Sequence, residues 1–380
     1  MAARTIKLTE VENVQGSLAS KLKSARTLTG MSTRAVAKQL SKGFSISHAT
    51  IANYESGKTV PPIDILASLA HLYDRPLNWF LERSQSLTGV RYRNLKSRVR
   101  SAELHQFEAN VQRWIDAYVS VEQRLNKTLK SSTCKIKNQR KLAPDALSRS
   151  VRETLGLSSE DPISSVVELL EAFGIRVLEE PTDLRIDGLA ARYSDEYVVI
   201  LNPTVSNDRV RLNAAHELAH VLFGDCDSDE AESKVMENRA FLFASHLLLP
   251  NNQLKQAFTG KSMVRLVQFK EKFGISLAAM VYRAEKLNFI TKDQAKKLWI
   301  EFSRRGWRNN EPGYVRPDRA TRFEQLVEEI LESGKMSIKE VSDLAGVRPE
   351  EIRDRLNLAI GIPSVLASQE DEAQTIKFPQ

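Results

Sequence analysis

The chain has 380 residues, of which 42% are hydrophobic and 27% are charged, a balance typical of folded domains in water, and its length allows two or three of them. No apolar run approaches the roughly 20 residues that a membrane-spanning helix needs, and the first residues lack the apolar centre of a secretory signal, so we expect a cytoplasmic protein without membrane association. Two cysteines, Cys134 and Cys226, are too few for a disulfide framework, as expected in a reducing compartment.

Basic charge is concentrated at the N-terminal end. Residues 1–100 contain 16 Lys and Arg against 6 Asp and Glu, a net charge of +10, whereas the whole chain carries +7, so the remaining residues carry −3. A basic excess of this kind suits an anionic partner such as nucleic acid. A solvated basic face is the alternative.

Residues 17–82 have the pattern of about five short helices. Gly30 and Gly57 are helix-stop signals, while Ser32 and Ser47 are placed to cap the helices that follow them. In a helix-turn-helix, a short turn joins two helices and the second presents its polar first turn to the DNA major groove. We therefore predict a domain in residues 1–85 that binds double-stranded DNA, with a helical bundle used only for dimerisation as the alternative.

The predicted recognition helix carries side chains that can hydrogen-bond base edges or phosphates, and lysines near it can neutralise phosphates. The candidate DNA-binding residues are Ser47, His48, Ala49, Thr50, Asn53, Lys38, Lys42 and Lys58. The segment resembles the phage-repressor (Cro/cI, or XRE) family of DNA-binding domains, most closely in "TIANYESGKTVPPIDILASLAHLYDRPLNWFL". Its turn "SKGFSIS" is longer than the usual turn of that family, which affects the orientation of the recognition helix.

Residues 86–135 change character. A basic segment, "GVRYRNLKSRVR", precedes "SAELHQFEANVQRWIDAYVSVEQRLNKTL", in which apolar residues recur at intervals of three and four. This spacing predicts a long amphipathic connecting helix. We expect it to pack on a neighbouring domain or on its own copy in a homodimer.

Residues 136–312 mix the two kinds of secondary structure. "LSRSVRETLGL" and "PISSVVELLEAFG" predict helices, and "IRVLEE", "IDGLAARYS" and "EYVVILNP" predict three short strands. Helices follow these strands, which favours an α+β domain with a small antiparallel sheet.

The stretch "RLNAAHELAHVLFG" raises the question of a metal. His216 and His220 are four residues apart, so on a helix their side chains lie about 40° apart around the axis and both can reach one ion. Zinc lowers the pKa of its bound water to about 7, and Glu217 between the histidines can accept a proton from that water as a general base. A chance occurrence of this motif has odds on the order of one in a hundred. A structural pair of histidines in a core helix is the alternative.

Catalytic zinc sites usually take three protein ligands and keep one position for water. The residues alone leave the third ligand open. Candidates on chemistry are Asp225, Cys226, Asp227, Asp229, Glu230, Glu232, Glu237 and His246. Arg209, Arg211 and Tyr193 are chemically able to stabilise an oxyanion, although each is equally suited to a structural role.

From about residue 147 to residue 312 the chain is similar to the ImmA/IrrE family of zinc metallopeptidases. The similar stretches include "IDGLAARYSDEYVVILNP", "RVRLNAAHELAHVLFGD" and "ENRAFLFASHLLLP". The resemblance implies that Glu237 is the third zinc ligand, and it places Phe241 where the family commonly has asparagine. It also implies cleavage of a regulatory protein, such as a helix-turn-helix repressor or the chain itself, in a response to stress or to a mobile element.

Residues 313–380 predict three further helices and a tail. The last two helices have the rhythm of a second helix-turn-helix, but the acidic residues of this block would oppose DNA phosphates. We expect a helical packing or interaction module.

The expected architecture is therefore multidomain and mainly α: an N-terminal all-α helix-turn-helix bundle, an α+β zincin-like metallopeptidase domain with a small sheet, and a helical C-terminal region. The expected function is that of a DNA-binding transcriptional regulator with a zinc-dependent endopeptidase domain. Two alternatives remain at this point. One is a non-proteolytic transcription factor whose metallopeptidase-like domain senses a ligand or metal, and the other is a toxin–antitoxin regulator.

Overall fold

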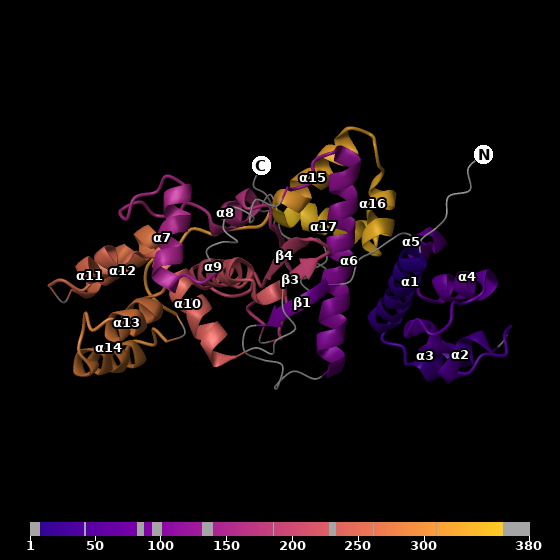
Figure 1. Ribbon diagram of the computed structural model, residues 1–380, viewed down its shortest axis with the longest axis horizontal. Helices are drawn as coiled ribbons and strands as arrows, with labels where there is room; N and C mark the ends of the chain where they lie inside the picture. The colour runs from indigo at the N-terminus through magenta and orange to yellow at the C-terminus, as the bar shows by residue number, and fades with distance from the viewer. Residues whose placement is uncertain are drawn as a thin grey trace, which may run out of the picture. The chain divides into compact units, whose positions relative to one another are not determined.

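The computed structural model describes residues 8–41, 43–81, 87–92, 101–130, 140–184, 186–227, 233–260, 262–308 and 310–359. They belong to two compact units, shown as ribbons in Figure 1. Unit 1 is drawn from Met1–Ser86, Arg100–Thr128 and Thr321–Gln380, and unit 2 from Leu87–Val99 and Leu129–Ala320. Within the described ranges, every helix is too short or too polar to span a membrane.

Unit 1 begins with five helices, as the sequence predicts. They are α1 (Leu8–Leu28), α2 (Thr33–Leu40), α3 (His48–Glu55), α4 (Ile63–Leu72) and α5 (Leu77–Leu81). The two predicted caps are present, because the Ser32 hydroxyl accepts a hydrogen bond from the backbone N–H of Ala35 and the Ser47 hydroxyl accepts one from Thr50. Apolar residues from all five helices share one core, including Leu22, Val36, Ile51, Leu69 and Phe80.

The rest of unit 1 is a second group of helices. It consists of α6 (Ser101–Leu125), α15 (Arg322–Glu332), α16 (Ile338–Ala345) and α17 (Pro349–Ala359). On α6, the ring centroids of Trp114 and Tyr118 lie 5.9 Å and 5.2 Å from that of Phe323 on α15, and Arg322 donates a hydrogen bond to the buried Glu122. The long amphipathic helix therefore buries its apolar face against the C-terminal helices. The predicted tail lies outside the described residues.

Unit 2 contains a four-stranded sheet with the order β1-β3-β4-β2. Its strands are β1 (Leu87–Tyr92), β2 (Arg176–Glu179), β3 (Gly188–Tyr193) and β4 (Glu196–Leu201). β1 and β3, like β3 and β4, are antiparallel, but β2 and β4 run parallel. The expectation of an antiparallel sheet is thus wrong for this last pair, because the chain from β2 passes on to β3 before the hairpin returns β4 between them.

The first strand also departs from the expectation. β1 lies in the stretch predicted as a basic connecting segment, and it adds a fourth strand to the three that the sequence indicates. Its pairing with β3 is interrupted by a bulge between Thr88 and Arg91. At the bulge, Gly89 adopts φ +57° and lies so close to the carbonyl of Cys226 that a Cβ would overlap it. This irregular register hides the strand from a period-two reading.

Helices cover the sheet of unit 2. They are α7 (Pro144–Thr154), α8 (Val166–Ala172), α9 (Asn207–Phe223), α10 (Lys234–Leu248), α11 (Asn251–Ala257), α12 (Met263–Phe273), α13 (Leu277–Lys286) and α14 (Lys292–Arg304), with a 3-10 turn η3 (Asp225–Asp227) after α9. α9, which carries the two motif histidines, contacts β3, β4 and α10 (Figure 1). Almost every residue of α9 is buried, and the helix ends at Gly224 with φ +76°, a left-handed cap.

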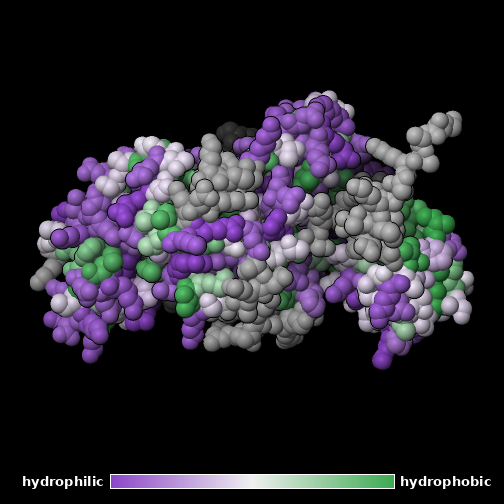
Figure 2. Space-filling model, in the orientation of Figure 1, coloured by the Kyte–Doolittle hydropathy of each residue, from purple (hydrophilic) through white to green (hydrophobic). Residues whose placement is uncertain are grey.

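The face of unit 2 visible in Figure 2 is largely hydrophilic, with small and separate hydrophobic patches. The segment after α14 is fixed to the domain rather than loose. The Asp318 carboxylate accepts hydrogen bonds from Ser165 and from the backbone of Val166 at the start of α8, and Glu311 does the same for the first turn of α13. Acidic side chains are favourable at helix N-termini, so both contacts hold the segment in place.

Candidate metal centre

Three side chains of unit 2 converge on one point. His216 and His220 come from α9, and Glu237 comes from the first turn of α10, which Ser233 caps. The Nε2 atoms of the two histidines lie 3.1 Å apart. One carboxylate oxygen of Glu237 lies 3.4 Å from Nε2 of His216, and the other lies 3.3 Å from Nε2 of His220. In the part of the chain that the structure describes, these residues form the group suited to hold an ion.

The separations fit a particular coordination geometry. A tetrahedral zinc ion with ligand bonds of about 2.0–2.1 Å places its ligand atoms about 3.3–3.4 Å from one another. The distance of 3.1 Å between the two Nε2 atoms, and those of 3.4 and 3.3 Å from them to the two oxygens of Glu237, lie close to this value. Two imidazole nitrogens and one carboxylate oxygen are also a ligand set that catalytic zinc sites use. The residues present therefore fit a zinc ion with one coordination position left open.

A fourth side chain orients His220. Nδ1 of His220 lies 2.8 Å from one carboxylate oxygen of Asp225, and Arg239 donates to the other oxygen at 2.6 Å. When Nδ1 donates its proton to Asp225, Nε2 keeps a lone pair that faces His216 and Glu237. Asp225, one of the ligand candidates, thus contacts Nδ1 of His220 and does not belong to the group of three. The left-handed turn at Gly224 brings it back to the histidine, a reversal that residue spacing alone does not reveal.

Electrostatic interactions in the centre favour a positive charge on His220 and a negative charge on Glu237. Burial lowers the pKa of the His220 imidazole, but hydrogen bonds with Asp225 and Glu237 outweigh burial and raise that pKa to about 10. Burial raises the pKa of the Glu237 carboxyl, but hydrogen bonds with His216 and His220 outweigh it and lower that pKa to about 2. These pKa shifts favour a protonated His220 beside an ionised Glu237, so a cation that binds between them competes with that proton.

Glu217 lies against β3 of the sheet, outside this group of three. Its side chain is fully buried, and Gly188 at the start of β3 approaches it so closely that an added Cβ would lie 3.1 Å from Oε1 of Glu217. A residue with a side chain at position 188 would press on the carboxylate. The sequence singles out Asp187-Gly188 only as a strand break, so this close approach is a finding of the structure.

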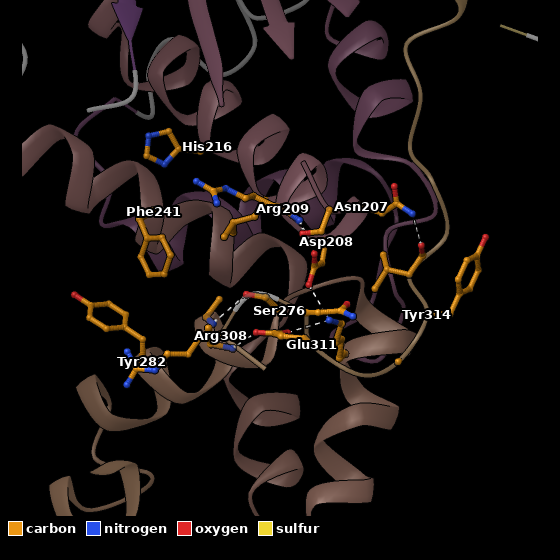
Figure 3. Close-up of a pocket in the computed structure, with 18 of the residues that line it drawn as sticks. Asn207, Asp208, Arg209, His216, Phe241, Ser276, Tyr282, Arg308, Glu311 and Tyr314 are labelled. Carbon is orange, nitrogen blue, oxygen red and sulfur yellow. Dashed lines mark hydrogen bonds and ion pairs between the residues drawn. The ribbon is translucent and has the colours of Figure 1, made fainter. Parts of the chain in front are cut away.

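A cavity of about 870 Å³ opens beside the centre. We call it the groove. Its wall comprises the first turns of α9 with His216, Glu237 and Phe241 of α10, Lys270 of α12, the first turns of α13, Trp299 of α14, and residues 308, 310, 311 and 313–315. Figure 3 shows His216, Phe241, Tyr282 and Arg308 among the residues that line it. His216 and Glu237 reach the groove, whereas Glu217 and His220 are not among the residues that line it.

The remaining ligand candidates lie elsewhere or have other partners. Cys226 is buried, and burial raises the pKa of its thiol, so the sulfur stays protonated. The carboxylate of Asp227 accepts hydrogen bonds from Arg140, Arg192 and Tyr197. Asp229, Glu230 and Glu232 lie outside the described residues.

His246 lines a different cavity, together with Asp145 and Arg149 of α7. Burial and the charge of Arg283 lower the pKa of the His246 imidazole to about 4, so the ring is neutral at physiological pH. It belongs to the packing of α10 and not to the metal centre.

The candidate oxyanion stabilisers separate in the structure. The guanidinium of Arg211 is buried and bound to Asp318 at 2.8 Å and to the carbonyl of Ile163, which is a structural role. Tyr193 pairs with Leu87 in the sheet and does not line the groove. Arg209 does line it, while donating to Asp187 at 2.5 Å. Arg209 is thus the one of the three that faces the groove.

The candidate DNA contacts lie on and around α3 of unit 1. His48 and Ala49 are exposed, and Thr50 and Asn53 are partly exposed. The Ser47 hydroxyl is used to cap α3. Lys38 and Lys58 are exposed, whereas Lys42 lies outside the described residues. The first turn of α3 is therefore accessible to a partner.

Comparison with known families agrees with this organisation. Residues 170–285 match the family model described as the IrrE N-terminal-like domain, which is a metallopeptidase family. Residues 22–80 match the family model described as helix-turn-helix. No curated protein matches the chain. The chain thus combines a DNA-binding helix-turn-helix domain with an IrrE-like, metallopeptidase-like domain that contains His216, His220 and Glu237, as expected of a regulator.

Proposed function

We propose that this chain is a DNA-binding transcriptional regulator whose IrrE-like domain is a zinc-dependent endopeptidase. His216, His220 and Glu237 hold the zinc ion, and Glu217 is the general base. The observation that carries this proposal is the mutual spacing of 3.1–3.4 Å among the three ligand side chains, because a structural histidine pair does not require a carboxylate at the third corner.

When bound, zinc would supply a Lewis acid and lower the pKa of a water molecule in its open coordination position. Side chains of this protein supply the orientation, the proton transfer and the stabilisation of charge. Asp225 keeps the Nε2 lone pair of His220 directed at the centre. Glu217 accepts a proton at its carboxylate during attack on the peptide carbonyl and returns that proton to the leaving amine. Arg209 lies in the groove wall, where it can stabilise negative charge on the carbonyl oxygen.

In the proposed regulator, α3 lies in the major groove of double-stranded DNA. Its exposed first turn with His48 and Ala49 meets base edges, and Lys38 and Lys58 meet phosphates. The proposed substrate is a regulatory protein, either a helix-turn-helix repressor or a second copy of this chain, cut in the cytoplasm in response to stress or to a mobile element. The family match to a helix-turn-helix supports the DNA-binding part.

One observation favours a second candidate function. Glu217 is fully buried and does not line the groove, although a general base must reach the reacting water. In a regulator that only senses a metal or ligand, such burial is no obstacle. Under this alternative, occupation of the centre changes DNA binding and no peptide bond is cut.

The Glu217→Gln variant separates the two candidates. If the proposal holds, the variant retains zinc, because Glu217 is not a ligand, and loses cleavage of the repressor or of the chain itself. If the domain only senses, neither wild type nor variant cuts, and both regulate DNA binding equally. Zinc content and DNA affinity of the full-length protein are measured beside cleavage, so an unfolded variant is recognised.

A further inference from the structure

The charged side chains that line the groove differ in whether they have a partner of opposite charge. They are Asp208, Arg209, Glu237, Lys270, Arg308 and Glu311. Lys270 pairs with both Asp208 and Glu311 at 2.9 Å. Arg209 pairs with Asp187, and Glu237 contacts the two histidines.

Arg308 is different. Its Nε donates to the hydroxyl of Ser303 at 2.5 Å, and no carboxylate within the described ranges forms an ion pair with its guanidinium. The side chain is exposed. Of the lining charges, it is therefore the one left to recognise an anion, and a guanidinium binds a carboxylate through two parallel hydrogen bonds.

An aromatic wall lies between the metal centre and the outer groove. Figure 3 shows the ring of Phe241 between His216 and Tyr282. The rings of Phe241 and Tyr282 meet edge to face, with centroids 5.4 Å apart, and both line the groove together with Trp299. Tyr282 is 37% exposed, so apolar surface is available for a ligand to bury.

The net charge of the groove also favours an anionic ligand. Three acidic and three basic side chains line the groove, so their formal charges cancel. A divalent cation on Glu237 would leave the groove net positive and would favour an anionic ligand. Lys286, whose ammonium lies 5.6 Å from the ring of Tyr282, adds positive charge nearby.

One residue of this wall departs from the family pattern. Phe241 stands where the ImmA/IrrE family commonly has asparagine. Trp299 and Arg308 lie beyond residues 170–285, the part that the IrrE-like family model matches, but within the stretch of residues 147–312 that resembles the family. Phe241 is thus the position in the wall at which this chain differs.

We propose that the groove selects a polypeptide segment with an aromatic or large apolar side chain beside the bond to be cut and an aspartate or glutamate close to it. Phe241 and Tyr282 contact the apolar side chain, and Arg308 binds the carboxylate. This inference rests on the proposed peptidase function. It assigns specificity to Arg308 and gives Arg308 no part in the bond cleavage.

Binding is tested separately from cleavage, in zinc-loaded full-length protein carrying Glu217→Gln. The probes are fluorescent peptides with a fixed phenylalanine, in which glutamate or lysine is placed at each of three positions on either side. Fluorescence anisotropy should show that glutamate, at one or more of these positions, tightens binding by about tenfold over lysine, the effect expected of a hydrogen-bonded ion pair. Equal binding of glutamate and lysine peptides at every position overturns the inference.

A charge-reversal variant at Arg308 supplies a second test of the inference. Arg308→Glu should invert the preference and favour lysine peptides. Arg316→Glu is the matched control, since Arg316 is exposed on the same connecting segment but does not line the groove, and it should keep the preference for glutamate. A preference that survives Arg308→Glu contradicts the assignment. Zinc content and circular dichroism establish that both variants are folded.

The proposed peptidase function and the proposed specificity are contradicted by different results. If the domain is not a peptidase, the peptides still bind with the acidic preference, but protein with Glu217 intact leaves them uncut. If only the specificity is wrong, that protein cuts glutamate and lysine peptides at equal rates.

Discussion

Nδ1 of His220 lies 2.8 Å from the carboxylate of Asp225, and both side chains are at least nine-tenths buried. Residues five apart in the chain meet because α9 ends between them in a left-handed turn at Gly224. The contact fixes the orientation of one ligand of the proposed zinc site, and Arg239 in turn fixes Asp225.

The first prediction concerns this contact. Asp225→Asn removes the charged acceptor while keeping the shape, so the His220 ring loses its preferred tautomer. Loss of such a supporting residue typically lowers metal affinity by about 10- to 100-fold. Competition with a chromophoric chelator measures the zinc affinity. Asp195→Asn, at a side chain that is 98% exposed, serves as the control, and equal affinities in the two variants contradict the supporting role.

The second prediction concerns Gly188. Gly188→Ala places a Cβ 3.1 Å from Oε1 of Glu217 and displaces the proposed base by a few tenths of an ångström or more. Cleavage should fall by about tenfold to a hundredfold, because small misplacements of catalytic groups are costly, while bound zinc stays unchanged. Gly43→Ala, where a Cβ meets nothing within 4 Å, should leave cleavage intact. Full activity of Gly188→Ala argues against Glu217 as the base.

The third prediction is a pH dependence of stability from His246. Burial and Arg283 hold its folded pKa at about 4, below the unfolded value of 6.5, so the unfolded chain takes up the proton first as the pH falls. The contribution of the neutral His246 imidazole to the free energy of unfolding is complete above pH 6.5 and is lost between pH 6.5 and pH 4. Between pH 7 and pH 5 the loss is about 2 kcal/mol.

Urea unfolding of wild type and His246→Gln at both pH values isolates this loss, because every other titrating group is common to the two proteins. Wild type should lose about 2 kcal/mol more than the variant. An equal loss in both, or an imidazole that titrates near pH 6.5 in NMR spectra of the folded protein, contradicts the assignment.

The fourth prediction concerns unit 1. Phe323 is 2% exposed and packs against Trp114 and Tyr118 of α6. Phe323→Ala should lower the free energy of unfolding of this unit by about 3–5 kcal/mol, as monitored by the fluorescence of Trp114. Ile63→Ala, at a side chain that is 63% exposed, should change it by less than about 0.5 kcal/mol. Similar values for the two variants indicate that α6 does not pack on the C-terminal helices.

The fifth prediction concerns DNA. Lys38→Ala should weaken binding to all sequences alike and reduce the salt dependence by about one counterion, as for loss of one phosphate contact. Replacement of His48 should instead change which sequences bind best. Titrations of labelled duplexes over a range of salt concentrations distinguish the two effects. An unchanged salt slope for Lys38→Ala removes it from the DNA interface.

The residues that could be read from the sequence are those whose relationship lies within one helix. His216 and His220 follow from a four-residue spacing, and Ser32 and Ser47 follow from the rules of helix capping. Glu237 follows only from family resemblance, because the fold of α10 onto α9 decides which of several acids meets the histidines. In the structure, the carboxylate of Glu237 lies 3.3–3.4 Å from the Nε2 atoms of the two histidines, whereas that of Asp225 lies 2.8 Å from Nδ1 of His220.

Contacts between segments that lie far apart in the chain could not be predicted from the sequence. The strand β1 is obscured by a bulge and by the basic segment that it enters, and the contact of Gly188 with Glu217 joins β3 to α9. Arg308 lines the groove together with residues of α9, α10 and α13, which lie far from it in the sequence. Such contacts depend on packing and not on local periodicity, so no spacing rule predicts them.

The central claim is that His216, His220 and Glu237 together hold a zinc ion. The most direct measurement is the metal content of purified full-length protein beside its His216→Ala and Glu217→Gln variants. The wild type and Glu217→Gln should each carry about one zinc ion per chain, and His216→Ala should carry almost none while keeping its helical circular dichroism. Equal zinc in wild type and His216→Ala would contradict the claim.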